Sequence, residues 1–181
     1  MEDTTQHRQG SQATGRGGTP ADVPMRRQAL GFAAFLLLAF AAGGVGSVLQ
    51  GTDVGARYLA FERPVWAPPS WAFGVVWPVL YVLIGVAAGR VWRVAGSVRP
   101  VAWPLGLWTV QLVLNAAWPG VFFGGDALWA AVGVILVLDA VVVATVVAFA
   151  RVDRLAAALL VPYLVWILYA TALNIAIAML N

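Results

Sequence analysis

Aromatic and amide side chains recur at helical spacing inside the apolar segments of this chain of 181 residues. The clearest such stripe contains, at intervals of three or four residues, Trp108, Gln111, Asn115, Trp118 and Phe122. Side chains at this spacing share one face of a helix, and an unpaired amide in hydrocarbon is unfavourable by several kcal/mol. We therefore expect this face to point into the protein, where the amides either bond neighbouring helices or line a ligand site.

Two other apolar segments carry aromatic faces of the same kind. They contain Phe73, Trp77 and Tyr81 in one segment, and Tyr163, Trp166, Ala170 and Asn174 in another. Membrane helices that pack closely favour small residues at their contacts, so these rings are expected to hold the helices apart. The belt of Trp and Tyr at membrane surfaces explains rings near segment ends, but Trp77 and Trp166 lie further inside their segments.

Apolar walls with a few polar groups are typical of pockets for flat organic ligands. Aromatic faces prefer offset stacking on other π-systems, so the expected ligand is planar, hydrophobic and partly polar. The chain has no cysteine, and its one histidine, His7, lies in the polar amino-terminal segment. We therefore predict no metal site and no required cofactor. Strong axial ligation of haem iron is disfavoured, and a metal-free macrocycle is easier to accommodate.

Prolines crowd the loop, running from Arg57 to Pro69, that precedes the second apolar segment. Proline fixes its own φ and keeps the preceding residue out of the helical region. The loop is expected to stay extended as far as Ser70, which we predict to be the N-cap of the next helix. Trp66 would then lie on a stiff segment over the mouth of the bundle, or the loop would pack on lipid headgroups.

Asp139 and a pair of glycines each allow two interpretations. Asp139 is the one acid within the apolar segments, and it is either a functional intramembrane acid or a hydrogen-bonded structural residue. Gly85 and Gly89 are separated by three residues, a pattern that indicates close helix packing or dimerisation.

The composition places these faces in a membrane. The chain is 61% hydrophobic and 10% charged, whereas soluble domains are about 45–50% apolar and about 25% charged. Each of five apolar segments approaches or exceeds the roughly 20 residues that a helix needs to cross a bilayer. These segments are Ala29–Leu49, Ser70–Gly89, Val101–Gly125, Ala127–Ala150 and Leu155–Asn181. The sequence therefore predicts an all-α membrane protein, a bundle of five transmembrane helices over residues 28–181, preceded by a disordered cytoplasmic tail, residues 1–27.

All eleven basic residues are arginines, and they lie between the apolar segments rather than in one polar cluster. Membrane topology explains this distribution better than nucleic-acid binding, so no nucleic-acid partner is expected. With five crossings, nine arginines fall on one side, and Arg57 and Arg63 fall on the other. The positive-inside rule then predicts a multi-pass protein of the cell membrane, with a cytoplasmic amino terminus and an extracytoplasmic carboxyl terminus.

Three long motifs resemble the TspO/MBR family, whose members are also called tryptophan-rich sensory proteins, translocator proteins or peripheral benzodiazepine receptors. They read RPVWAPPSWAFGVVWPVLY at 63–81, QLVLNAAWPGVFFG at 111–124 and RVDRLAAALLVPYLVWILYATALN at 151–174. The resemblance implies a five-helix bundle, commonly a homodimer in membrane lipid, that binds tetrapyrroles such as protoporphyrin IX. It also implies that some bacterial members promote porphyrin breakdown that depends on light and oxygen.

The site predicted from the faces and from the resemblance together consists of Tyr58, Trp66, Phe73, Trp77, Asn115, Trp118, Phe122, Trp166 and Ala170. Tyr58 rests on the resemblance alone, which also implies that Trp77 and Trp166 carry any porphyrin chemistry. At two places this sequence departs from the family pattern in residues that the family uses for other functions. Its fourth-helix acid aligns with Val134 rather than Asp139, and its sterol motif aligns with Ile175 and Met179, which lack the expected Tyr and basic residue.

The leading hypothesis is an integral membrane protein that binds a porphyrin-type tetrapyrrole and acts as a sensor or regulator. One alternative is an enzyme that degrades porphyrin in light and oxygen, with Trp77 or Trp166 as redox partner. The other alternative is a porphyrin transporter, although the sequence shows neither an inverted repeat nor a pair of broken helices, which many carriers contain.

Overall fold

The computed structural model describes residues 24–124 and 127–181, and within them the secondary structure is helical, without strands. The helices are α1 (Met25–Leu49), α2 (Val54–Ala60), α3 (Trp71–Ala95), a short 3₁₀ turn (Arg99–Val101), α4 (Ala102–Gly124), α5 (Leu128–Ala150) and α6 (Arg154–Leu180). Five of these elements are long and apolar enough to cross a membrane. The predicted five-helix bundle is therefore confirmed.

The ends of two predicted segments differ from the sequence-based expectation. Most of the predicted tail, residues 1–23, lies outside the described residues, and Met25 to Arg27 already belong to α1. The loop expected between Arg57 and Pro69 begins with the last turn of α2, which contains Tyr58. Ser70 directly precedes α3 as predicted, but its side chain makes no capping hydrogen bond.

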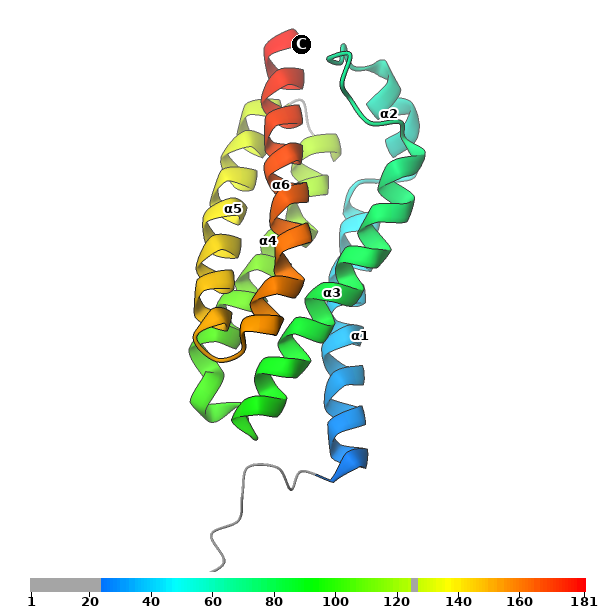
Figure 1. The fold of residues 1–181 in the computed structure, drawn as a ribbon. Helices are drawn as coiled ribbons and strands as arrows, with labels where there is room; N and C mark the ends of the chain where they lie inside the picture. Colours follow the sequence, from blue (N-terminus) through cyan, green and yellow to red (C-terminus); the bar gives the residue numbers. More distant parts are fainter. Residues whose placement is uncertain (1–23, 125–126) are drawn as a thin grey trace, which may run out of the picture.

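The long helices run alternately up and down, so that short connections join neighbours in the bundle (Figure 1). α1 packs on α3 and α4, α5 packs on α4 and α6, and α3 also contacts α6. The carboxyl terminus and α2 lie at one end of the bundle, which we call the α2 end. The chain turns from α3 into α4 and from α5 into α6 at the opposite end.

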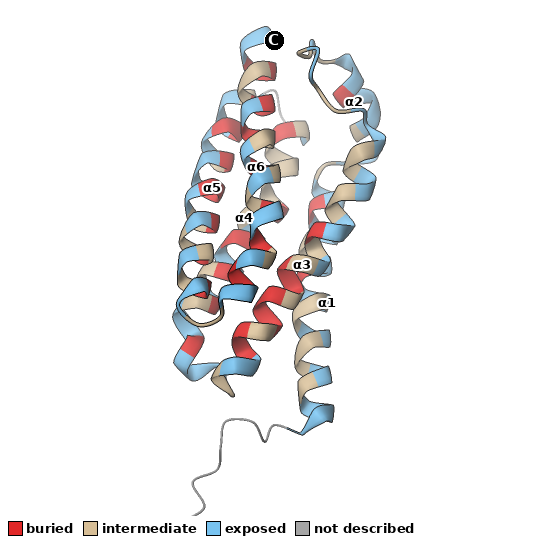
Figure 2. Ribbon diagram, in the orientation of Figure 1, coloured by how far each residue is buried: buried red, intermediate tan, exposed pale blue. Residues whose placement is uncertain are grey.

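Burial follows the pattern of a membrane bundle. Buried residues line the inner faces of the helices, while the outer faces are exposed (Figure 2). Exposed side chains on those outer faces include Leu37, Val75 and Val165, which are apolar and therefore suit contact with lipid. In the half of the bundle away from the α2 end, the core is filled by apolar side chains such as Ile84, which is fully buried.

Close packing of α1 on α3 depends on glycines. A Cβ atom on Gly85 would lie 2.9 Å from the Cα atom of Leu36, and one on Gly89 would lie 2.6 Å from Cδ1 of Phe32. Both glycines are buried. The Gly85 and Gly89 pair therefore serves helix packing within the chain, and α1 covers this glycine face of α3.

A polar contact closes the end opposite α2. Asp153 is the N-cap of α6, where Oδ1 accepts hydrogen bonds from the backbone N–H groups of Leu155 at 2.8 Å and Ala156 at 3.4 Å. Oδ2 of the same carboxylate forms an ion pair of 2.8 Å with Arg90 near the end of α3. One short acidic side chain thus starts α6 and fixes it to α3.

Candidate functional site

A cavity of about 590 Å³ occupies the half of the bundle nearest the α2 end. Its lining comes from α1, α2, α3, α4 and α6, and α5 does not contribute. This volume falls within the roughly 300–1,000 Å³ of typical ligand pockets. The filled core described above closes the cavity towards the opposite end.

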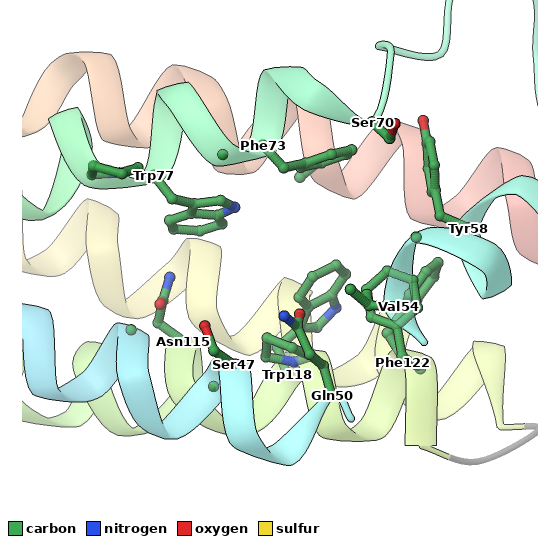
Figure 3. A pocket seen from close by; sticks show the side chains of 18 of the residues that line it. Ser47, Gln50, Val54, Tyr58, Ser70, Phe73, Trp77, Asn115, Trp118 and Phe122 are labelled. Atoms are coloured by element: carbon green, nitrogen blue, oxygen red, sulfur yellow. The ribbon is translucent and has the colours of Figure 1, made fainter. Parts of the chain in front are cut away.

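Two pairs of stacked rings form facing walls. On α3, the rings of Trp77 and Tyr81 stack with centroids 5.5 Å apart and planes 26° apart. On α4, the rings of Trp118 and Phe122 stack at 5.0 Å and 22°. Figure 3 shows Trp77, with Phe73 one turn away, across the cavity from Trp118 and Phe122. A flat guest between these walls would meet an aromatic surface on both faces.

Asn115 is the centre of a hydrogen-bond chain at the deep end of the cavity. Its Oδ1 accepts a bond of 2.9 Å from the Tyr81 hydroxyl, and its Nδ2 donates at 3.1 Å to the Tyr163 hydroxyl oxygen. The Tyr163 hydroxyl donates in turn to Oε1 of Gln111 at 2.9 Å. The amide face of α4 therefore points inward, as predicted. These amides join three helices, which confirms the interhelical interpretation; Asn115 also lines the cavity, and its part in ligand binding stays a prediction.

Asn174 of α6 holds one of the rings. Its Oδ1 accepts a hydrogen bond of 3.1 Å from the indole N–H of Trp118, while its Nδ2 is buried without a partner. Because an indole nitrogen only donates, this bond fixes which end of the Asn174 amide is the oxygen. It also holds the Trp118 ring against the cavity.

Side-chain bonds fasten the loop between α2 and α3. The Tyr58 hydroxyl donates to the carbonyl oxygen of Pro68 at 2.8 Å, and the Tyr169 hydroxyl donates to that of Trp66 at 2.9 Å. Asn181 exchanges two bonds of 3.1 Å with the backbone of Glu62. The loop is thus tied to α2 and to the carboxyl-terminal half and end of α6, beside the α2 end of the cavity, which we call its mouth.

An arginine lies beside this mouth. The Arg63 guanidinium carbon lies 4.7 Å from the centre of the Tyr58 ring, a cation–π distance. Its Nε is buried and has no hydrogen-bond partner. Tyr58 lines the cavity, so only the Tyr58 ring separates the positive charge of Arg63 from the cavity.

The structure brings together most of the predicted site residues. Those that line the cavity are Tyr58, Phe73, Trp77, Asn115, Trp118, Phe122 and Ala170. Trp66 and Trp166 do not line it. The Trp66 ring packs on Tyr169 with centroids 5.7 Å apart and remains 46% exposed. Trp166 packs edge-on against Phe73 at 5.9 Å, behind the wall, with its N–H buried and unpaired. The role of all nine residues in binding remains a prediction.

Several lining residues were not predicted. The additional polar ones are Ser47, Gln50, Ser70, Tyr81 and Asn174. Tyr81 and Asn174 belong to the aromatic faces recognised in the sequence, so a signal for them was present. Ser47 and Gln50 lie near the end of α1, where polar residues are equally expected at a membrane surface, so their sequence positions carried no distinct signal.

Asp139 lies outside the cavity. It is 8% exposed, and its Oδ2 accepts a hydrogen bond of 2.8 Å from the Thr171 hydroxyl. This bond joins α5 to α6, which supports the structural interpretation of Asp139. Among residues 24–124 and 127–181, no group of three or more His, Cys, Asp or Glu side chains is placed to hold a metal ion.

Comparison with known proteins places the chain among relatives. The model of the TspO/MBR family matches residues 34–180. The "Translocator protein" of Homo sapiens is 44% identical over 119 residues, which cover 65% of this chain and 70% of that protein. The "Tryptophan-rich protein TspO" of Chlorobaculum tepidum is 36% identical over 157 residues, covering 87% and 99%. "Protein CrtK" of Rhodobacter capsulatus is 35% identical over 150 residues, covering 83% and 92%. The chain is therefore a multi-pass membrane protein of the TspO/MBR family.

Proposed function

We propose that this protein binds a porphyrin-type tetrapyrrole in the cavity and acts as a membrane sensor or regulator. The observation that carries the proposal is the pair of facing walls, in which Trp77 stacks on Tyr81 and Trp118 stacks on Phe122. Both walls are aromatic, which suits a ring system that is flat and conjugated over its whole area.

The polar groups support the same class of ligand. They include Asn115 and Tyr81 at the deep end and Tyr58 at the mouth, with Ser47 and Gln50 along the α1 side between them. Arg63 lies over the Tyr58 ring with an unpaired Nε. An anionic edge of a porphyrin, such as one with two propionates, would gain a charge-assisted contact there while the uncharged edge lies deeper.

Titration of the purified protein with protoporphyrin IX tests the proposal. We expect saturable quenching of tryptophan emission, because Trp77 and Trp118 would lie against the bound ring. Trp77→Ala combined with Trp118→Ala should weaken binding by at least about tenfold, since stacking of one base on an aromatic side chain is worth about 1–3 kcal/mol. Binding is measured by porphyrin absorbance, which remains usable when tryptophans are removed.

Trp103→Ala is the matched control. Trp103 lies near the start of α4, at the end opposite the cavity, and is 73% exposed. We expect this variant to bind protoporphyrin like the unchanged protein. Quenching that does not saturate, or equal affinity in the double variant and in the control, would reject the proposal.

A further inference from the structure

A chain of hydrogen bonds connects the cavity with the centre of the bundle. It runs from Tyr81 on α3 to Asn115 on α4, then to Tyr163 on α6, and back to Gln111 on α4. All three bonds are donated in the same direction, away from the cavity. Tyr81 and Asn115 line the cavity, whereas Gln111 is 1% exposed and Tyr163 is fully buried.

The far end of the chain is incomplete. Nε2 of Gln111 is buried and has no hydrogen-bond partner. A buried donor without a partner is unfavourable, because it has lost its bond to water and gained nothing in return. The direction of the chain causes this deficit, since Gln111 offers its oxygen, rather than its nitrogen, to Tyr163.

The same four side chains can also be bonded in the opposite direction. Each amide carries an acceptor on one side and donors on the other, so a half-turn of the Gln111 and Asn115 amides exchanges these roles. Gln111 Nε2 then donates to Tyr163, Tyr163 donates to Asn115, and Asn115 donates to Tyr81. All three bonds are kept. The Tyr81 hydroxyl, which now accepts a bond from Asn115, becomes free to donate its own hydrogen bond to an acceptor in the cavity.

We propose that Tyr81 is a hydrogen-bond donor for a neutral acceptor oxygen of the bound ligand, and that the chain to Gln111 reverses when this oxygen binds. The proposal deepens the proposed function and rests on it, because it concerns the ligand edge that lies deepest in the cavity. Reversal gives the Gln111 nitrogen its partner and leaves a carbonyl oxygen unpaired instead, and unpaired carbonyls are better tolerated than unpaired N–H groups. The ligand oxygen then accepts the hydrogen bond that the Tyr81 hydroxyl is free to donate.

The location of Tyr81 favours a carbonyl over a carboxylate. Tyr81 lies ten residues into α3, in the middle of a membrane-spanning helix. The described arginines lie at the helix ends and in the connections, away from this depth. An anion here would lack a countercharge in a region of low polarity, whereas a ketone or amide oxygen needs only the one hydrogen bond.

Packing fixes the position of the Tyr81 ring. Trp77 stacks on one side of it, and α1 approaches so closely that a Cβ atom on Gly43 would lie 2.4 Å from Cε2 of Tyr81. The ring therefore has no room to swing away when its partner changes. Only the hydroxyl proton and the amides need to turn, which keeps the site preorganised.

Two porphyrins that differ only at one edge test the proposal. Mesoporphyrin IX and 2,4-diacetyldeuteroporphyrin IX share the ring and both propionates, but the first carries ethyl groups where the second carries acetyl groups. The measured quantity is the ratio of their affinities, acetyl over ethyl, for the full-length protein in detergent. Tyr81→Phe should lower this ratio by about threefold to tenfold, the effect of losing one hydrogen bond.

Gln111→Leu gives the sharper prediction, because it should raise the ratio. Removing the Gln111 acceptor leaves the Tyr163 hydroxyl to donate to Asn115, so the chain is already reversed and Tyr81 is free to donate. The increase should again be about threefold to tenfold, and it should vanish when Tyr81→Phe is also present. Gln111→Met provides a second variant with the same expected result if the leucine variant does not fold.

Each outcome is decisive. An unchanged ratio in Tyr81→Phe, or a ratio that falls in both Gln111 variants, overturns the chain-reversal proposal while mesoporphyrin binding upholds the proposed function. Failure of both porphyrins to bind the unchanged protein overturns both proposals. Resonance Raman spectra give an independent readout, because the acetyl C=O stretch should shift to lower frequency on binding and return in Tyr81→Phe.

Discussion

Asn174 shows how much one side chain at the cavity determines. Its oxygen accepts the only hydrogen bond that the Trp118 indole donates, and Trp118 in turn stacks on Phe122. The sequence pattern places Asn174 on an aromatic face of α6 but does not reveal this contact. In the structure the Asn174 amide orients the Trp118 ring, which belongs to α4.

Asn174→Leu should therefore affect stability and binding together. The substitution leaves the Trp118 N–H unpaired in a poorly hydrated site, which lowers the free energy of unfolding by about 1–3 kcal/mol. We expect weaker protoporphyrin binding as well, since the ring is no longer held in place. Thermal unfolding in detergent measures the first effect. The same substitution in a Trp118→Phe background should cost less, and an equal loss there would show that the hydrogen bond is not the cause.

Trp166 provides the opposite case. It lies behind Phe73 with a buried N–H that has no partner. Trp166→Phe keeps an aromatic ring and removes the unpaired donor, so stability should be equal or higher and protoporphyrin affinity should change by less than about twofold. Porphyrin absorbance under illumination is the second measurement. Breakdown that is lost in Trp166→Phe at unchanged affinity would favour the enzymatic alternative.

At the level of residues, the sequence predicted that rings from several helices share a cavity, but it did not predict which of those rings lie outside the cavity lining. Helix geometry explains why Trp166 lies outside the cavity lining, because residues four apart are rotated by about 40° relative to each other. A stripe that runs from Trp166 through Ala170 to Asn174 therefore turns gradually around α6. Ala170 and Asn174 face the cavity, while Trp166 has turned towards α3. Trp66 lies in a loop, where no periodicity indicates which way a ring points.

At the level of elements, glycines determine how closely α1 approaches α3. Gly85→Ala should push the helices apart, because the new Cβ would meet the backbone of Leu36 at 2.9 Å and backbone cannot move as a side chain does. We expect a loss of about 1–3 kcal/mol in the free energy of unfolding, the usual result of overpacking. Thermal unfolding in detergent again provides the measurement.

Gly133→Ala is the matched control for this substitution. Gly133 lies in α5 and is exposed, and a Cβ atom added there would have no neighbouring atom within 4 Å. Since alanine favours helix over glycine by about 1 kcal/mol, this variant should be as stable as the unchanged protein or more so. Equal effects at both positions would show that helix propensity, rather than the contact with Leu36, determines the result.

The loop at the cavity mouth should open without unfolding the bundle. Tyr169→Phe combined with Asn181→Ala removes three of the hydrogen bonds that tie the loop to α6. We expect faster amide hydrogen exchange between Glu62 and Trp66 and unchanged exchange in the long helices, because local opening does not require global unfolding. Exchange that rises equally in α6 would contradict a local role.

Hydropathy predicted the long helices because the bilayer requires about 20 apolar residues for each. The same measure could not predict α2, whose seven residues VGARYLA are too few to show periodicity or to span a membrane. The glycine contacts of α1 with α3 were equally hidden. A Gly-xxx-Gly pattern indicates close approach, but it does not reveal whether the approaching helix belongs to the same chain.

At the level of the whole molecule, charge divides the two ends of the bundle. Arg57 and Arg63 lie at the α2 end, while the other described arginines lie at or near the helix ends on the opposite side (Figure 1). The positive-inside rule predicts that this opposite end faces the cytoplasm. The mouth of the cavity, with Arg63 beside it, would then open on the outer side of the cell membrane.

Single-cysteine labelling tests this orientation cleanly, because the chain contains no cysteine of its own. Thr52 precedes α2 and Ser97 follows α3, so the two exposed residues lie at opposite ends of the bundle. In intact cells, a membrane-impermeant maleimide should label Thr52→Cys at once and Ser97→Cys only after the membrane is made permeable. The reverse pattern would place the cavity mouth in the cytoplasm, and a ligand would then reach it from inside the cell.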